Sequence, residues 1–282
     1  RLEIDKNMDK NLLNILKDEL EVSRGQLYEM DGPLDLTYFM KLANIKGYDN
    51  LKYSPIMPQT SPYFLEDENI FNAISKNDIL LHHPYQSFEP VVELVKTAAE
   101  DPDVLAIKQT PYRVSYHSPI VGALAKAAEN GKQVTVLVEL KARFDEENNI
   151  IWAKRLEKAG CHVIYGLVGL KTHCKVLLIV RKEENGIKRY VHLGTGNYND
   201  VTAKIYSDFG LFTSNPYFGA DASALFNMLS GHSEPKSMYK AVLAPLNMRE
   251  SFISLIRQEA DNARAGRRAK IIAKVNSLVD TE

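Results

Sequence analysis

The spacing of apolar residues changes along the chain and divides it into three stretches. In the first stretch, residues 1–5 alternate like a strand, and four leucines at residues 12–20 recur at helical spacing, which predicts an amphipathic helix. A short helix is predicted at residues 34–42. Three prolines within residues 53–62 then indicate a linker, so we expect the first domain to end near residue 65.

From about residue 69 the pattern alternates between short apolar runs and amphipathic segments, as in a layered α/β domain. The apolar runs predict strands at residues 79–82, 104–108, 134–141, 162–165, 173–180, 188–193 and 206–212. The amphipathic segments predict helices at residues 88–99, 119–129, 145–159 and 221–229. The run at residues 134–141 is apolar on both faces, as a central parallel strand is. The run at residues 173–180 is followed by a hairpin turn at residues 183–186, so a mixed sheet is expected.

The last stretch predicts a long polar helix at residues 246–265 and the beginning of a strand at residues 270–275. Both ends of the chain are strand-like, and residue 1 is Arg rather than Met. We therefore expect an internal fragment of a larger protein.

Composition and charge limit the class of protein. Hydrophobic residues make up 45% and charged residues 25%, as in ordinary globular proteins, and the formal net charge is −1. A neutral chain is not a globally basic nucleic-acid binder, so no nucleic-acid partner is expected, and any polyanion must meet a local cluster of cations. Cys161 and Cys174 form no C-x-x-C pair, which argues against a zinc cage or a disulfide framework and favours a cytoplasmic location.

Basic side chains gather where the predicted strands end. Lys108 closes one strand and Arg113 follows it, Arg143 follows the next strand, and Lys171 precedes a third. In parallel α/β sheets ligands bind beyond the carboxyl ends of the strands, and Arg and Lys are the side chains that hold phosphate. The pattern therefore predicts a site for a phosphate-type ligand.

His173 and Lys175 form the motif with the most chemical content. On a strand these two side chains would point to the same face. A neighbouring ammonium repels a metal ion, but it lowers the pKa of the imidazole and holds an anionic group, so the pair suits a nucleophile. A partly buried His beside a solvated Lys at the start of a strand gives the same pattern. His82 and His83 have no partners at ligand spacing and are expected to pack or to form hydrogen bonds.

His173-x-Lys175, followed by Gly194-Thr195-Gly196-Asn197, resembles the H-x-K…G-[ST]-x-N signature of the phospholipase D superfamily. The acidic residue that the signature places after the lysine is absent, because residues 180–182 are Val, Arg and Lys. This departure disfavours an ordinary phospholipase or nuclease. Longer stretches are similar to bacterial polyphosphate kinases of the long, multidomain type, and the similarity covers essentially the whole chain: Ile79–Tyr85, Ala106–Arg113, Val138–Asn148, Gly166–Lys175 and Gly266–Ile272.

This resemblance implies an α/β fold with three parts. Residues 66–232 would form a phospholipase D-like mixed-sheet sandwich, the first catalytic domain. Residues 1–65 would be the end of a preceding α+β domain with its Pro-rich linker. Residues 233–282 would be the opening helix and strand of a second phospholipase D-like catalytic domain.

The resemblance also implies an activity: reversible transfer of the γ-phosphoryl group of ATP to inorganic polyphosphate through a phosphohistidine, with Mg²⁺ as cofactor. His173 would be the nucleophile and Tyr206 would contact the nucleotide. Arg113 and Arg143 match positions that the family associates with magnesium. A guanidinium has no acceptor, so we expect them to hold phosphate oxygens that in turn hold the ion. The other expected catalytic or phosphate-binding groups are Lys108, Lys171, Lys175 and Asn197.

Two other functions remain open: a phospholipase D-like phosphodiesterase and a non-catalytic polyanion-binding domain. The absent acidic residue and the loops of Arg113 and Arg143 favour the kinase over the phosphodiesterase. His173 favours an enzyme over a binding domain, which would prefer Lys or Arg there. The family's amino-terminal domain and most of its second catalytic domain are missing, so the fragment is expected to fold but to have little or no kinase activity. The resemblance further implies a homo-oligomer for the full-length protein and allows peripheral membrane association.

Overall fold

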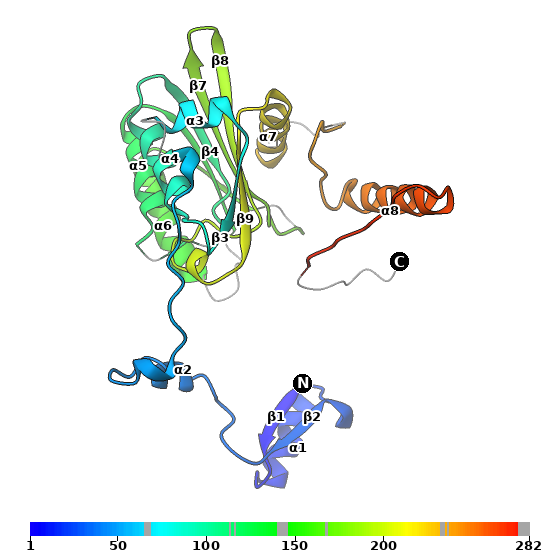
Figure 1. The fold of residues 1–282 in the computed structure, drawn as a ribbon. Helices are drawn as coiled ribbons and strands as arrows, with labels where there is room; N and C mark the ends of the chain where they lie inside the picture. Colours follow the sequence, from blue (N-terminus) through cyan, green and yellow to red (C-terminus); the bar gives the residue numbers. More distant parts are fainter. Residues whose placement is uncertain are drawn as a thin grey trace. The chain divides into compact units, whose positions relative to one another are not determined.

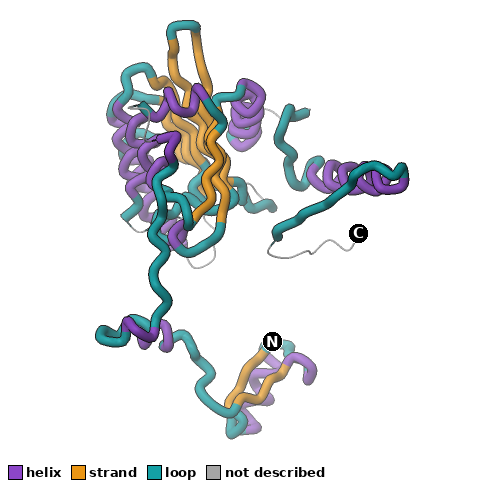
Figure 2. The backbone as a smooth tube through the Cα atoms, in the orientation of Figure 1, coloured by secondary structure: helices purple, strands orange, loops and turns teal. Residues whose placement is uncertain are grey.

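The computed structural model describes two compact units of the chain, Arg1–Pro55 and Ile56–Glu282. The described residues are 1–64, 69–112, 114–115, 117–139, 146–166, 169–231, 235 and 237–275, without the side chains of Glu146 and Asn148. Figure 2 shows strands in orange and helices in purple in both units. Within the described ranges, no helix has both the length and the apolar character needed to cross a bilayer.

The first unit is a small α/β element. Strands β1 (Leu2–Asp5) and β2 (Leu27–Met30) pair in parallel and are joined by helix α1 (Lys10–Glu19). The Asp9 side chain caps α1 by accepting from the backbone amides of Asn11 and Leu12. Helix α2 (Phe39–Leu42) is shorter than the predicted helix at 34–42, and β2 was not predicted because its sequence, LYEM, does not alternate between apolar and polar residues.

The second unit is built on a seven-stranded mixed sheet in the order β3-β9-β8-β7-β4-β5-β6. Strands β4, β5 and β6 run parallel to one another, and the remaining pairs are antiparallel. The mixed α/β sandwich predicted from the sequence is confirmed. The strands are β3 (Ile79–His83), β4 (Val104–Gln109), β5 (Gln133–Val138), β6 (His162–Tyr165), β7 (Lys175–Glu183), β8 (Gly186–Gly194) and β9 (Asp208–Thr213).

Helices cover both faces of this sheet. Figure 1 shows α4, α5 and α6 on one face and α7 on the other. The α-helices of the second unit are α3 (Ile70–Lys76), α4 (Glu89–Glu100), α5 (Pro119–Glu129), α6 (Glu146–Lys158), α7 (Pro216–Leu229) and α8 (Met248–Arg264). Short 3₁₀ helices lie at Arg24–Gln26 and Asp49–Leu51 in the first unit, and at Pro62–Phe64 and Thr202–Lys204 in the second.

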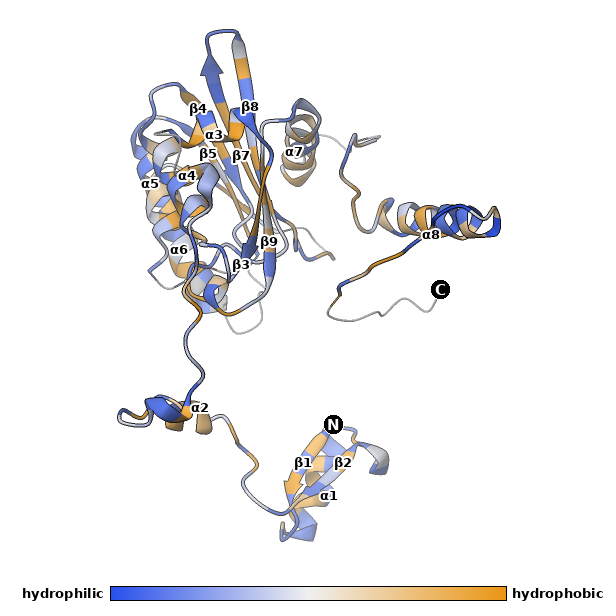
Figure 3. Cartoon of the chain, in the orientation of Figure 1, coloured by the Kyte–Doolittle hydropathy of each residue, from blue (hydrophilic) through white to orange (hydrophobic). Residues whose placement is uncertain are grey.

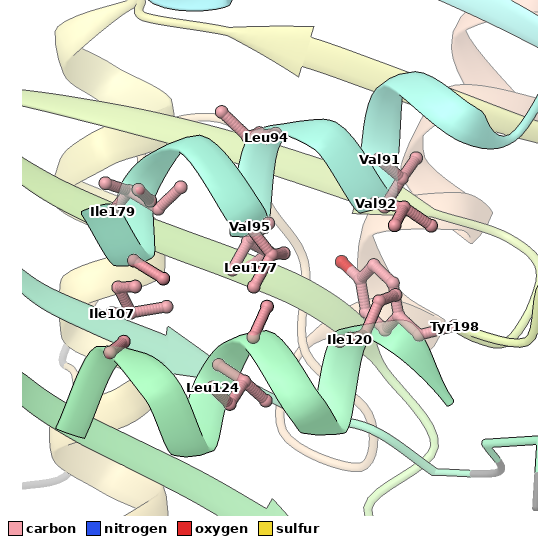
Figure 4. Packing of buried hydrophobic residues seen from close by; sticks show 14 of the residues in the cluster. Val91, Val92, Leu94, Val95, Ile107, Ile120, Leu124, Leu177, Ile179 and Tyr198 are labelled. Carbon is pink, nitrogen blue, oxygen red and sulfur yellow. The ribbon is translucent and has the colours of Figure 1, made fainter. Parts of the chain in front are cut away.

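Strand β7 lies at the centre of the core and is buried on both faces. Leu177 and Ile179 pack against α4 and α5, where Val95 and Leu124 meet them (Figure 4). The alternate side chains, such as Leu178, pack against α7 in a second cluster. Burial of each such side chain stabilises the folded chain by about 1.5–3 kcal/mol. This packing fixes the register of β7 and so the position of its first residue.

At the other end of the sheet, β7 and β8 extend past the packed helices as a hairpin. Its turn residues are hydrophilic, as Figure 3 shows in blue, which is expected where no helix covers the strands. The buried half of β7 is therefore the half that begins at Lys175.

Several predicted bounds differ from the structure: α7 begins at Pro216 rather than at residue 221, and β5 ends at Val138 rather than at residue 141. β7 begins at Lys175, so His173 lies in the preceding loop, and β9 begins at Asp208, so Tyr206 also lies before its strand. Residues 270–275 are not a strand, because within the described chain no other segment pairs with them. Helix α3 was not predicted, since its seven residues give too short a helical pattern.

Candidate functional site

A cavity of about 450 Å³ opens at the end of the sheet where β7 begins and β8 ends. Its wall is formed by the end of β3, the segment that leads into β7, and the connection from β8 to β9. The polar side chains that line it include His83, His173, Lys175, His192, Asn197, Tyr206 and Asp208. The H-x-K and G-T-G-N segments, separate in the sequence, thus meet at one cavity.

His173 and Lys175 are in direct contact although His173 is not on the strand. The ammonium of Lys175 lies 3.2 Å from His173 Nδ1 and also donates to the backbone carbonyl of His173. Lys175 is 4% exposed, whereas the His173 side chain is exposed. Because an ammonium has no lone pair, Nδ1 accepts, and the neutral imidazole then carries its proton on Nε2.

Tyr112 packs against both members of this pair. Its ring lies edge-on to the imidazole of His173, with centroids 5.1 Å apart, and its centroid is 4.9 Å from the Lys175 ammonium. A cation over an aromatic face is stabilised by about 0.5–2 kcal/mol. Tyr112 therefore fixes the two side chains together. Sequence reasoning missed this role, although Tyr112 stands in the loop after a predicted strand, where site residues gather.

Two buried histidines form an uncharged part of the wall. Burial lowers the pKa of His192 to about 3 and also lowers the pKa of His83. His83 Nδ1 lies 2.8 Å from the carbonyl of Gln86, and His192 Nδ1 lies 3.0 Å from the Tyr198 hydroxyl. Both rings are neutral at pH 7, so neither adds a positive charge beside Lys175. His83 was expected only to pack or form hydrogen bonds, and His192 was not singled out in the sequence.

Asp208 is the only carboxylate among the described residues that line the cavity. It accepts a hydrogen bond of 2.8 Å from the Thr195 hydroxyl, and that hydroxyl in turn accepts from the amide of Phe209. A Cβ on Gly196 would lie 2.5 Å from Asp208 Cγ, so the loop closes over Asp208 only with glycine there. The sequence analysis did not select Asp208. The signal in the sequence was the acidic residue absent from the H-x-K signature, since a carboxylate from another segment can take such a place.

Four of the predicted site residues line this cavity together: His173, Lys175, Asn197 and Tyr206. The side-chain oxygen of Asn197 is buried without a hydrogen-bond partner in the described part of the chain, and Tyr206 is 62% exposed.

Lys108 and Lys171, the other predicted residues that the structure describes, do not line the cavity. Lys108 pairs with Leu178, which packs toward α7, whereas Lys175 shares the opposite face of the sheet with Leu177. Lys108 therefore points away from Lys175, because the end of a strand does not by itself say which face a side chain takes. Lys171 is exposed and does not line the cavity. Arg113 and Arg143 lie outside the described residues.

The described residues offer no protein cage for a metal ion. Among them, no group of three or more His, Cys, Asp or Glu side chains is arranged to hold one. Asp208 is the one carboxylate among the described lining residues, and Mg²⁺ in such sites takes its other ligands from water and substrate phosphates. The donor set instead suits an ion that arrives with phosphate oxygens.

Three family models match the chain. The description "Polyphosphate kinase C-terminal domain 1" covers residues 69–235, "Polyphosphate kinase C-terminal domain 2" covers residues 241–282, and "Polyphosphate kinase middle domain" covers residues 1–42. Their joins fall at the linker before the second unit and at the approach to α8.

Curated relatives agree with these models. A polyphosphate kinase of Halalkalibacterium halodurans is 56% identical over 283 residues, which is 99% of this chain and 40% of that protein. A polyphosphate kinase of Bacillus cereus is 53% identical over 285 residues, with the same coverage of both chains. The chain thus spans about 40% of the length of these relatives.

A solved structure gives the same result. The crystal structure of polyphosphate kinase from Porphyromonas gingivalis matches with a TM-score of 0.78 and 32% identity, over 95% of this chain and 41% of that one. Nuc from Salmonella typhimurium, a phospholipase D family member, matches weakly, with a TM-score of 0.42 and 16% identity over 58% of this chain. Because one polyphosphate kinase model alone matches more than half of the residues, the chain belongs to the polyphosphate kinase family.

Proposed function

We propose that this chain supplies the phosphohistidine site of an enzyme that transfers the γ-phosphoryl group of ATP reversibly to inorganic polyphosphate. The observation that carries the proposal is the contact between His173 Nδ1 and the Lys175 ammonium, 3.2 Å apart, at a cavity that Asn197 and Tyr206 also line. Membership of the polyphosphate kinase family supports the choice of substrates.

The transfer takes place in two steps. A nitrogen of His173 attacks the γ-phosphorus, an N–P bond forms, and the bond to the bridging oxygen breaks so that its electron pair leaves with ADP. The terminal oxygen of polyphosphate then attacks the phosphohistidine, the N–P bond breaks, and the imidazole is restored. The sum is ATP + polyphosphate(n) = ADP + polyphosphate(n+1).

The scheme must also account for the proton on the imidazole. The Lys175 ammonium occupies Nδ1, so Nε2 carries the proton of the neutral ring and must lose it if Nε2 attacks. Asp208 is the carboxylate among the described lining residues and is our candidate to accept that proton. It would return the proton when the imidazole is restored.

Charge neutralisation supplies most of the remaining catalysis, since phosphoryl transfer depends on positioning and on cations around the phosphate. A cation and an anion 4 Å apart gain about 4 kcal/mol at an effective dielectric constant of about 20, which makes the buried Lys175 a substantial contributor. Tyr206, exposed at the cavity, is proposed to contact the nucleoside. Arg113 and Arg143 stay proposed phosphate-binding residues, and Lys171 is a weaker proposal at the rim.

Magnesium enters this scheme as part of the substrate MgATP. The described residues fit an ion held by phosphate oxygens and do not form a site of their own. Arg113 and Arg143 would hold the phosphate groups rather than the ion, because a guanidinium cannot ligate a cation.

A phosphodiesterase of the phospholipase D kind is the second candidate, and Asp208 is the observation in its favour. The sequence argument against it was the absent acidic residue, and the structure shows a carboxylate in the cavity that could serve in its place. The two functions differ in the acceptor, which is polyphosphate in the kinase and water or an alcohol in the phosphodiesterase.

The experiment uses the full-length protein with γ-labelled ATP. We expect acid-labile, base-stable label on the wild type, loss of that label to background in His173→Ala, and retention in His162→Ala, a matched change of an exposed histidine on β6. A chase with polyphosphate should move the label into the polymer and not into free phosphate. Label that persists in His173→Ala would overturn the assignment of His173, and release of free phosphate alone would favour the phosphodiesterase.

The resemblance also suggests a homo-oligomeric, cytoplasmic enzyme with peripheral membrane association when full length. We retain these as proposals. Sedimentation of the full-length protein with and without lipid vesicles tests oligomerisation and membrane association directly.

A further inference from the structure

The hydroxyl group of Thr110 lies beside the segment that carries His173 and Lys175. Thr110 follows β4 and is 1% exposed. Its hydroxyl donates to the carbonyl of Cys174 at 2.8 Å and accepts from the amide of Val176 at 2.9 Å. One side chain thus binds the peptide groups on both sides of Lys175.

The sequence explains why a side chain is needed at this place. Strands β4 and β7 pair as far as Gln109 and Leu177, and the Thr110 amide adds one more bond, of 3.0 Å, to the carbonyl of Val176. The next residue is Pro111, which has no N–H and cannot extend the ladder toward Lys175. The Thr110 hydroxyl takes over at the point where backbone pairing with β4 stops. A buried amide or carbonyl left without a partner costs about 1–3 kcal/mol, so the hydroxyl fixes the chain here.

A second buried side chain holds the same segment from the other side. The Glu139 carboxylate accepts from the amide of Thr172, the residue before His173, at 3.1 Å. Glu139 follows β5 and is 4% exposed. The backbone is therefore held immediately before His173 by Glu139 and immediately after it by Thr110. Neither side chain lines the cavity.

We propose that Thr110 and Glu139 are positioning residues for the phosphoryl transfer. They fix the backbone around His173 so that its imidazole meets Lys175 and Tyr112 in the observed geometry. This inference rests on the proposed function, because it takes His173 as the group that accepts the phosphoryl group. A displacement of a reacting group by about 1 Å costs on the order of 100-fold in rate, so a loss of either hydrogen bond should lower the rate of transfer. Binding of ATP should change little, because neither residue lines the cavity.

The test compares Thr110→Val with Thr110→Ser in the full-length protein. Valine keeps the shape and removes the hydroxyl, whereas serine keeps the hydroxyl and removes a methyl group. We measure the single-turnover rate of phosphohistidine formation from γ-labelled ATP, the KM for ATP and thermal unfolding. Thr110→Val should slow formation about 10- to 100-fold with KM within about threefold, and Thr110→Ser should stay within about threefold of the wild-type rate.

Three results would overturn the inference. Thr110→Val at the wild-type rate would show that the hydroxyl is not needed. An equal loss in Thr110→Ser would show that packing matters and the hydroxyl does not. A change confined to KM would show contact with the substrate instead of positioning.

Glu139→Gln decides the question if Thr110→Val does not fold. The amide keeps the shape of the side chain but weakens the bond to the Thr172 amide, so we expect a slower rate by about 3- to 10-fold at unchanged KM. A wild-type rate would overturn the role of Glu139 and, with an unfolded Thr110→Val, the inference as a whole. Failure of the proposed function is a different result: the wild type itself would then carry no label that depends on His173.

Discussion

At the scale of single residues, the cavity combines one buried cation with neutral imidazoles. Lys175 lies beside His173, and Tyr112 packs on both. His83 and His192 are buried deeply enough that their pKa values fall below the ordinary range. If these rings were charged they would repel the Lys175 ammonium, so their burial removes that repulsion.

The buried state of His192 predicts how stability depends on pH. Burial lowers its pKa from 6.5 to about 3 in the folded chain. Between these values the unfolded chain binds a proton that the folded chain does not, so the stabilisation present above pH 6.5 is lost as the pH falls toward 3. The free energy of unfolding should fall more steeply in the wild type than in His192→Gln between pH 6 and 4, by up to about 1.4 kcal/mol per pH unit.

Urea unfolding followed by the fluorescence of Trp152 measures this slope. Trp152 is the only tryptophan and is 5% exposed in the second unit. His162→Gln changes an exposed histidine and should keep the wild-type slope. Equal slopes in the wild type and His192→Gln would contradict the prediction.

At the scale of elements, the cavity exists because three strands meet where side chains are small. Gly194 at the end of β8 pairs with Gly210 on β9, and Gly210 also pairs with β3. A Cβ at Gly210 would lie 2.7 Å from His192 Nε2 and 3.3 Å from His83 Nε2. Glycine therefore allows the imidazoles of β3 and β8 to lie over β9.

Hydrogen bonds from a buried side chain connect α6 to the segments around the site. Asn149 is fully buried and donates to the carbonyls of Glu139 and Tyr112 at 2.9 and 3.4 Å. Its own oxygen accepts from the indole N–H of Trp152. Helix α6 thus holds the segments that follow β4 and β5, which contact His173 and the residue before it.

Gly210→Ala tests the packing at β9. The added methyl group would overlap the two imidazoles, and overpacking of this kind costs about 1–3 kcal/mol. Gly122→Ala on α5 is the matched control: apart from the chain neighbours and the backbone of its own helix, no described atom lies within 4 Å of the new carbon, and alanine in a helix stabilises by about 0.5–1 kcal/mol. Urea unfolding followed by Trp152 fluorescence should give opposite signs for the two variants. A destabilisation of Gly122→Ala as large as that of Gly210→Ala would refute this account of β9.

At the scale of the whole molecule, the described cavity lies within the second unit, and the chain spans about 40% of the length of its relatives. The model of the second C-terminal domain matches only residues 241–282. Phosphoryl transfer requires cations and an acceptor site on the side of the phosphate away from His173. We therefore expect those groups to come from parts of the relatives that this chain does not span.

The 282-residue chain on its own should accordingly show no ATP-dependent polyphosphate synthesis above background, whereas we expect the full-length protein to show it. Circular dichroism should show that the isolated chain is folded, so that inactivity is not a failure to fold. Measurable polymer synthesis by the folded chain would contradict the prediction.

Much of the fold was predictable from the sequence because helices and strands leave local patterns. The helix at residues 119–129 was predicted with the bounds of α5, and the apolar run at 176–180 became the buried centre of β7. The predicted bounds were wrong where pairing with other strands, and not the local pattern, decides where a strand begins. His173 and Tyr206 follow the alternating pattern of their neighbours, but no partner strand pairs with them.

The sequence by itself determined the family and four side chains of the cavity: His173, Lys175, Asn197 and Tyr206 stand in local motifs. Only the tertiary structure decided that Lys108 faces away and that Tyr112, Asp208 and His192 join the site. The physical reason is range. Periodicity and short motifs depend on residues a few positions apart, whereas the cavity depends on the register of β3, β4, β7, β8 and β9, which brings distant strand ends together.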